Sequence, residues 1–166
     1  MTCLRELPFN LPGRIFGGVM PFGLFDPSGE CFSEFKPKGI QVIVLLAENE
    51  ECLRLTGRNL VNFYEKEGYE VIHLPIPDAG IPSIETLEHA STLVIKHANR
   101  GRNILIHCHA GVGRTGVFMA HLAKMLFGFS GEQAIQWVKR YTSMIESEEQ
   151  RRFILEDENQ GQGISK

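Results

Sequence analysis

Ile104-Leu-Ile-His-Cys-His-Ala-Gly-Val-Gly-Arg-Thr-Gly116 is the stretch on which the fold prediction depends. Its apolar start, 104–106, has the length and composition of a short buried strand. The chain then passes through a glycine-bearing turn and takes up helical spacing from Arg114 onward. A strand, a tight loop and a helix N-terminus form an anion site, because backbone N–H groups point inward and the helix dipole favours negative charge. One thiol, Cys108, and one guanidinium, Arg114, fall within that predicted site.

Cys108 and Arg114 have the chemistry of a nucleophile and a phosphate clamp. A free thiol has a pKa of about 8.5, and inward N–H groups, a helix N-terminus and a nearby Arg lower it to about 3.5–7.5. We therefore predict a thiolate at Cys108, the alternative being a buried inert cysteine. Arg114 can bind phosphate through two parallel hydrogen bonds. Gly111 and Gly113 allow the backbone to turn its amides toward the anion.

Composition limits the class of protein. The 166 residues are enough for one domain with a real core. We expect a single catalytic domain over 1–158 and a flexible tail over 159–166, whose apolar content is low. The net charge of −3 gives no basic footprint, so nucleic acid is not an expected partner. No apolar run approaches the roughly 20 residues of a membrane helix, so no membrane association is expected.

The four cysteines of the chain, Cys3, Cys31, Cys52 and Cys108, show no paired spacing. The pattern therefore indicates neither a disulfide framework nor a zinc site. The N-terminus has no basic region followed by an apolar stretch, so no secretory signal is expected. Together these features predict a reduced, cytoplasmic protein with no metal and no other cofactor. We expect Cys3, Cys31 and Cys52 to be inert.

Strands and helices alternate along the chain. Strands are predicted at 39–46, 69–74 and 104–106, with an edge strand at 14–19. Helices are predicted at 48–67, 83–99, 114–127, 130–141 and 146–157. The pattern indicates an α/β fold: a single domain with a largely parallel central sheet of four to five strands, flanked by helices. The loops before residue 37 carry Phe16, Phe22, Phe25, Phe32 and Phe35, which we expect to pin these loops to the core, an aromatic wall for a ligand being the alternative.

The order His107-Cys108-x5-Arg114-Thr115, with its preceding strand and following helix, resembles the signature of cysteine-dependent protein tyrosine phosphatases. The match runs from about residue 11 to residue 153 and is nearest to the small atypical dual-specificity phosphatases. The resemblance implies hydrolysis of phosphotyrosine through a cysteinyl-phosphate intermediate. A shallow pocket would also admit phosphoserine and phosphothreonine. The loop that would bind the phosphate consists of His109, Ala110, Gly111, Val112, Gly113 and Arg114.

Four further residues receive roles. The resemblance implies that Thr115 hydrogen-bonds the sulfur of the nucleophile and that His107 is buried as a support for the loop. Asp78 is the expected general acid, because it follows a strand in a proline-rich loop 30 residues before Cys108; a turn Asp is the alternative. Residues 143–150 resemble the segment that supplies a water-orienting Gln in the small dual-specificity phosphatases, which implies this role for Gln150, or as second choice for Glu146, a helix-surface Gln being the alternative.

Other interpretations share parts of the pattern. A rhodanese-like enzyme would lack Asp78 and Thr115. A phosphate-binding pseudo-enzyme would have lost one of the reacting residues. Phosphoinositides are disfavoured because the loop contains no Lys, and RNA 5′ ends are disfavoured by the acidic net charge. The expected partner is thus a phosphorylated protein or peptide, and the expected state is a monomer.

Overall fold

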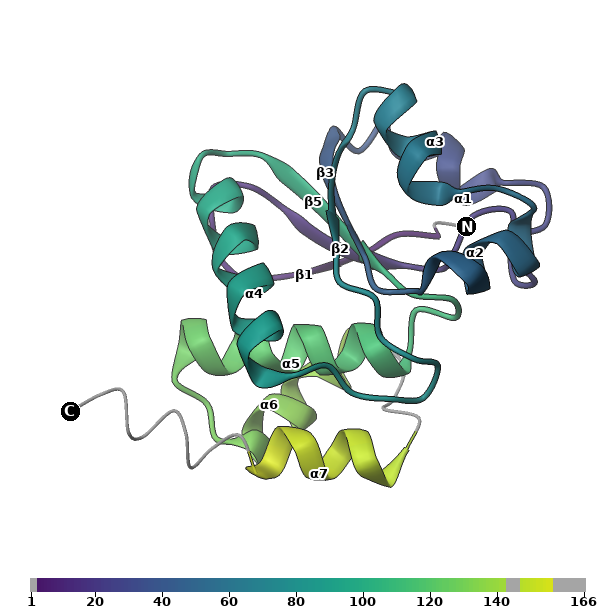
Figure 1. The fold of residues 1–166 in the computed structure, drawn as a ribbon. Helices are drawn as coiled ribbons and strands as arrows, with labels where there is room; N and C mark the ends of the chain where they lie inside the picture. Colours follow the sequence, from purple (N-terminus) through teal and green to yellow (C-terminus); the bar gives the residue numbers. More distant parts are fainter. Residues whose placement is uncertain (1–2, 143–146, 157–166) are drawn as a thin grey trace.

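The computed structural model describes residues 3–142 and 147–156 as one α/β domain around a five-stranded sheet (Figure 1). The strand order is β1-β2-β5-β3-β4. Only the β1–β2 pair is antiparallel within this sheet, and the other three pairs are parallel. The strands are β1 (Arg5–Leu7), β2 (Ile15–Gly18), β3 (Ile40–Leu45), β4 (Glu70–His73) and β5 (Asn103–His107). The predicted fold class is confirmed.

Helices cover both faces of the sheet. The short α1 (Glu30–Ser33), α2 (Asn49–Thr56) and α3 (Leu60–Lys66) lie on one face (Figure 1). On the other face lie α4 (Ile84–Asn99), α5 (Gly113–Phe127), α6 (Gly131–Val138) and α7 (Glu148–Glu156). Alternate residues of β3 and β5 feed two separate apolar clusters, with Val44 and Ile106 on the α5 side and Ile43 and Leu105 on the α3 side. Burial on both faces is why these strands are almost continuously apolar.

The carboxyl ends of the central strands meet at one edge of the sheet. Beyond β3, the N–H of Leu46 donates to the carbonyl of His107, the last residue of β5 (2.9 Å). Beyond β4, the N–H of Ile76 donates to the carbonyl of Leu46 (2.9 Å). The segments that leave β3, β4 and β5 are therefore joined at this edge, where ligands of parallel sheets bind.

Two predicted elements differ from the structure. The single helix expected over 48–67 is divided into α2 and α3, because Gly57 ends α2 with a φ of 71° and Asn59 caps α3 through the N–H of Asn62. The strand expected at the edge, β2, is interior, because β1 pairs on its outer side. The helices predicted over 83–99 and 130–141 are present as α4 and α6, and both begin at a serine cap: Ser83 accepts from the N–H of Thr86, and Ser130 forms a capping box.

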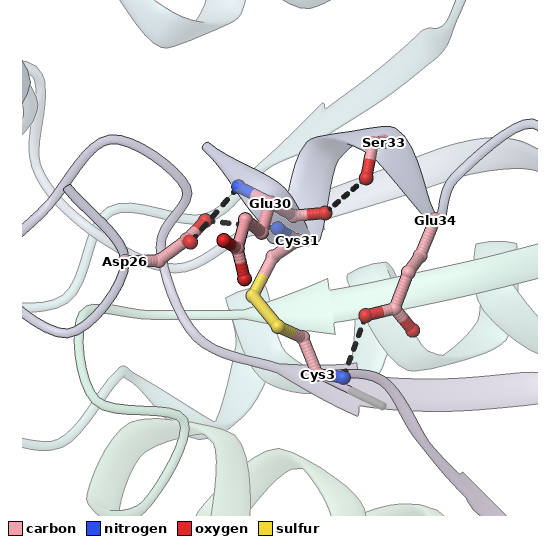
Figure 2. Close-up of a disulfide and its surroundings, with 6 residues drawn as sticks. All are labelled: Cys3, Asp26, Glu30, Cys31, Ser33 and Glu34. Carbon is pink, nitrogen blue, oxygen red and sulfur yellow. Dashed lines mark hydrogen bonds between the residues drawn. A yellow bond between two sulfur atoms is a disulfide. The ribbon is translucent and has the colours of Figure 1, made fainter. Parts of the chain in front are cut away.

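A disulfide joins Cys3 to Cys31, contrary to the expectation that the cysteines would be unpaired (Figure 2). The two residues are 28 apart in sequence, but the N-terminal segment lies beside α1, so their Cα atoms are 5.2 Å apart. Asp26 accepts from the N–H groups of Glu30 and Cys31 and so holds the first turn of α1 against the bond. Spacing in sequence carries no sign of this proximity.

Candidate active site

Cys108 and the first turn of α5 form the centre of the site. Cys108 follows the last residue of β5 and is 3% exposed, and the hydroxyl of the fully buried Thr115 donates to its Sγ (3.2 Å). The contact predicted for Thr115 is thus present. The first N–H groups of a helix have no partner within the helix, so the start of α5 presents donors to this loop.

Gly111 shows why the loop needs glycine. Its φ is 75°, in the left-handed region, and an added Cβ would lie 2.6 Å from the carbonyl oxygen of Gly18 at the end of β2. No side chain fits at that distance. The N–H of Met20 also donates to the carbonyl of His109 (2.9 Å). The loop after Cys108 is therefore packed against the chain that leaves β2.

Arg114 is paired with a carboxylate that sequence reasoning missed. The two oxygens of Glu51 accept from Nη1 (2.7 Å) and Nη2 (2.8 Å) of Arg114, and both side chains are buried. Burial alone would raise the pKa of Glu51, but the hydrogen bonds and charge of Arg114 outweigh it and lower that pKa. Glu51 lies in α2, in an acidic segment beyond β3. Its position shortly after a predicted buried strand was the only sign in the sequence that Glu51 could reach the site. Glu48 and Glu50 have the same position, so the sequence did not single out Glu51.

The guanidinium of Arg114 also contacts the loop after β4. Its Nη1 donates to the carbonyl of Ile76 (2.9 Å), and its Nη2 lies 3.4 Å from Oδ1 of Asp78. Within the described residues its Nε is buried and has no hydrogen-bond partner. Glu51 thus fixes one side of the planar guanidinium, and the Nε–H remains unsatisfied beside the loop of Cys108. An incoming oxyanion could accept a hydrogen bond from this N–H.

Asp78 lies on the loop predicted to carry the general acid. Its side chain is 71% exposed, and the structure brings it to Arg114, 36 residues later in the chain. The N–H of Gly80 closes a turn to the carbonyl of Pro77 (2.8 Å), with Ala79 between them at a φ of 60°. An exposed carboxyl beside the Arg114 guanidinium is compatible with a group that exchanges a proton with substrate and solvent.

His107 has the buried position that the family resemblance implied. Its Nδ1 lies 2.8 Å from the carbonyl of Cys108 and its Nε2 lies 2.8 Å from the hydroxyl of Tyr64. Burial lowers the pKa of His107 to about 4, the carbonyl bond opposing that shift. The ring is neutral near pH 7, so Nδ1–H donates to Cys108 and Nε2 accepts from Tyr64. The strand end before the nucleophile is thereby fixed from α3.

Gln150 is fully buried in the first turn of α7, which excludes the helix-surface interpretation. Its Nε2 donates to the carbonyl of Gly80 (3.1 Å), next to the loop that carries Asp78. The second choice for this role, Glu146, lies outside the described residues, as does the tail expected at 159–166.

Phe25 lies beside His109, a residue of the predicted phosphate loop. Phe16 and Phe35 are buried and Phe22 and Phe32 are partly buried, as expected, but Phe25 is 63% exposed, so the expectation that it pins a loop to the core is wrong. Its ring centroid lies 5.1 Å from that of His109, the residue after the nucleophile. The alternative interpretation, an aromatic wall, suits this residue.

One trio within residues 3–142 and 147–156 has the spacing of metal ligands: Cys3, Asp26 and Cys31. The two sulfurs are joined in the disulfide, and the oxygens of Asp26 accept backbone N–H groups. Cys52 is buried away from solvent, and burial raises the pKa of its thiol to about 12. The disulfide therefore leaves neither Cys3 nor Cys31 with a thiolate for a metal, and the Cys52 thiol is protonated near pH 7.

Comparison with known proteins agrees with this geometry. Residues 18–126, which run from the last residue of β2 through most of α5, match the family described as "Polymorphic toxin system, DSP-PTPase phosphatase". The chain belongs to this family of dual-specificity and tyrosine phosphatases. Cyclin-dependent kinase inhibitor 3 of Mus musculus is 32% identical over 106 residues, covering 61% of this chain and 48% of its own length. The chain thus spans about half the length of the curated relatives it matches first.

Solved structures support the same fold. A kinase associated phosphatase, with its catalytic-site cysteine replaced by serine, superposes with a TM-score of 0.85 at 24% identity, over 95% of this chain and 94% of that one. Tk-PTP in its active form gives a TM-score of 0.75 at 27% identity, over 94% and 97%. No helix in the described part of the chain is long and apolar enough to cross a bilayer.

Proposed function

We propose that this protein hydrolyses phosphate monoesters on proteins through a cysteinyl-phosphate on Cys108. The observation that supports it best is the unsatisfied Nε of buried Arg114, held beside a thiol that already accepts a hydrogen bond from Thr115. Leaving a charged donor unpaired in the interior is costly. A phosphate dianion bound by Arg114 and the amides of residues 109–114 would satisfy that donor.

In the first step the thiolate of Cys108 attacks phosphorus, and the bond to the ester oxygen breaks. Asp78 transfers its proton to that oxygen, so that an alcohol or phenol leaves. Arg114 and the loop amides neutralise charge on the phosphoryl oxygens, which is most of what a protein contributes to this kind of transfer. The product of this step is phosphate bound to sulfur.

In the second step water attacks the phosphorus and the sulfur leaves. Asp78, now a carboxylate, takes a proton from the water. Thr115 stabilises the departing sulfur through the hydrogen bond it already makes (3.2 Å). Gln150 is proposed to orient the water, with its amide at the acid loop as the supporting contact. Inorganic phosphate and the free thiolate are the products.

The surroundings of the loop favour phosphotyrosine, with phosphoserine and phosphothreonine as further substrates. An ester bound at Cys108 would extend past the ring of His109, where the exposed ring of Phe25 offers an aromatic surface. Offset and edge contacts between rings stabilise such complexes beyond the area they bury. The relative named kinase associated phosphatase agrees with a phosphoprotein as substrate.

The test is hydrolysis of p-nitrophenyl phosphate by the purified chain. Cys108→Ser, which is nearly isosteric, should abolish turnover, and Arg114→Lys, which keeps the charge but removes Nε, should reduce kcat/KM at least a hundredfold. Turnover retained by Cys108→Ser would refute the mechanism. A panel of phosphotyrosine peptides, phosphothreonine peptides, phosphoinositides and RNA 5′ phosphates then identifies the substrate class, a preference for either of the last two contradicting the proposal of a protein substrate.

A further inference from the structure

The loop that carries Asp78 is attached to a distant part of the chain. The hydroxyl of Ser147 donates to the carbonyl of Ala79 (3.0 Å), and Nε2 of Gln150 donates to the carbonyl of Gly80 (3.1 Å). Ser147 and Gln150 lie 68 and 70 residues away from their acceptors in the sequence. The carbonyl groups of both residues that follow Asp78 therefore accept hydrogen bonds from the start of α7.

The turn at Asp78 needs such support. Ala79 has a φ of 60°, a left-handed conformation that residues with a Cβ rarely adopt and that persists where surrounding contacts enforce it. The turn itself supplies one hydrogen bond, from the N–H of Gly80 to the carbonyl of Pro77. The contact of Asp78 with Arg114 is long, at 3.4 Å, and the Asp78 side chain is 71% exposed, so this contact stabilises the turn little.

Ser147 uses a single hydroxyl for two contacts. It accepts from the N–H of Gln150 (3.2 Å), as an N-cap residue of α7 does, while it donates to Ala79. The cap orders the turn of helix from which Gln150 reaches Gly80. The orientation of the acid loop and the start of α7 are therefore coupled through one oxygen atom.

We propose that Ser147 is a positioning residue for the general acid, and that the start of α7 holds Asp78 in the place where it protonates the leaving group. This inference rests on the proposed function of Asp78. Within residues 3–142 and 147–156, the hydrogen bonds of the Ser147 hydroxyl go to Ala79 and Gln150 and not to the nucleophile or the phosphate loop. Its effect should accordingly appear only in the step that needs the acid.

Three variants separate the two contacts of this hydroxyl. Ser147→Asp keeps an acceptor for the cap but cannot donate to Ala79, and its charge faces a carbonyl oxygen. Ser147→Thr keeps both contacts. Ser130→Ala is the matched control, because it removes the cap of α6, which has no hydrogen bond to the acid loop.

Leaving groups of graded acidity provide the measurement. Departure of phenol from phenyl phosphate needs a proton, whereas departure of 2,4-dinitrophenol from its phosphate ester needs almost none. For Ser147→Asp we expect kcat/KM on phenyl phosphate to fall roughly five- to tenfold, the usual consequence of losing one hydrogen bond. On the dinitrophenyl ester we expect it to stay unchanged. Ser147→Thr and Ser130→Ala should behave as the wild type on both esters.

The inference would be overturned if Ser147→Asp hydrolysed both esters at the wild-type rate. It would also be overturned if the variant lost the same factor on both esters, because an equal loss indicates a purely structural effect. Amide hydrogen exchange gives a readout without substrate: the N–H of Gly80 should exchange faster in Ser147→Asp, and unchanged exchange contradicts the tether. Failure of the proposed function looks different, because there the wild type itself shows no turnover dependent on Cys108, and the inference falls with it.

Discussion

Neutralising Glu51 should destabilise the protein and weaken phosphate binding together. In Glu51→Gln the amide oxygen can still accept from one Nη group of Arg114, but the opposite charge is lost while Arg114 stays 2% exposed. Removing one partner of a buried ion pair costs about 3–5 kcal/mol, and the retained hydrogen bond places this variant at about 3. For a chain of this size that corresponds to a fall in Tm of about 6–12 °C.

Urea unfolding at several pH values checks both the size and the origin of this effect. Arg114 lowers the pKa of Glu51 below its ordinary 4.5, so the carboxylate stabilises the native state above pH 4.5. That stabilisation is lost as the pH falls through the lower native pKa. The difference between wild type and Glu51→Gln should thus be full at pH 7 and shrink below pH 4.5.

Glu50→Gln is the matched control, since Glu50 is exposed on the same helix and should change stability by less than about 0.5 kcal/mol. In Glu51→Gln, kcat/KM for p-nitrophenyl phosphate should fall along with stability, because the guanidinium loses the partner that fixes its plane. If Glu51→Gln unfolds at the same urea concentration as the wild type at pH 7, Arg114 does not depend on Glu51 and the reasoning is refuted.

Three further predictions concern the surroundings of the loop. Because burial holds the pKa of His107 at about 4 against an ordinary 6.5, the free energy of unfolding should drop by about 3 kcal/mol as the pH falls from 6.5 to 4, and His107→Gln should lose this dependence in urea titrations. Gly111→Ala would set a Cβ 2.6 Å from a backbone oxygen at a φ of 75°, so turnover of p-nitrophenyl phosphate should be lost; wild-type kinetics would contradict this. Cys31→Ser opens a link across 28 residues and should lower stability by about 3–4 kcal/mol in non-reducing urea titrations, while turnover at 25 °C persists.

The sequence predicted what depends on local patterns. The buried strands, the helices α4 and α6 and the loop from Cys108 to Thr115 follow from apolar periodicity and a short motif. The prediction of a single helix over 48–67 failed because a local feature interrupts the pattern: Gly57, with its left-handed φ, ends α2 inside this segment. Helical spacing of apolar residues continues through such a break, so the pattern alone does not reveal it.

Contacts across long separations were the other omission. Glu51 reaches Arg114 over 63 residues, Ser147 reaches Ala79 over 68, and the disulfide closes 28. Each pair is determined by how the elements pack around the sheet, not by spacing in the chain. Phe25 belongs to the same class, because its exposure follows from where its loop meets His109.

Arg114 makes two contacts with carboxylates, one that is permanent and one that can be exchanged. Its ion pair with Glu51 is buried and has two short hydrogen bonds. If the guanidinium moved away, two buried charges would be left unpaired. Its contact with Asp78 is long, and the Asp78 side chain is mostly exposed, so this contact contributes little to stability. A phosphate that binds Nε can therefore change the position of Asp78 without disturbing the clamp. In the proposed mechanism, Arg114 would bind the phosphate while the start of α7, through its hydrogen bonds to Ala79 and Gly80, would orient the proton donor.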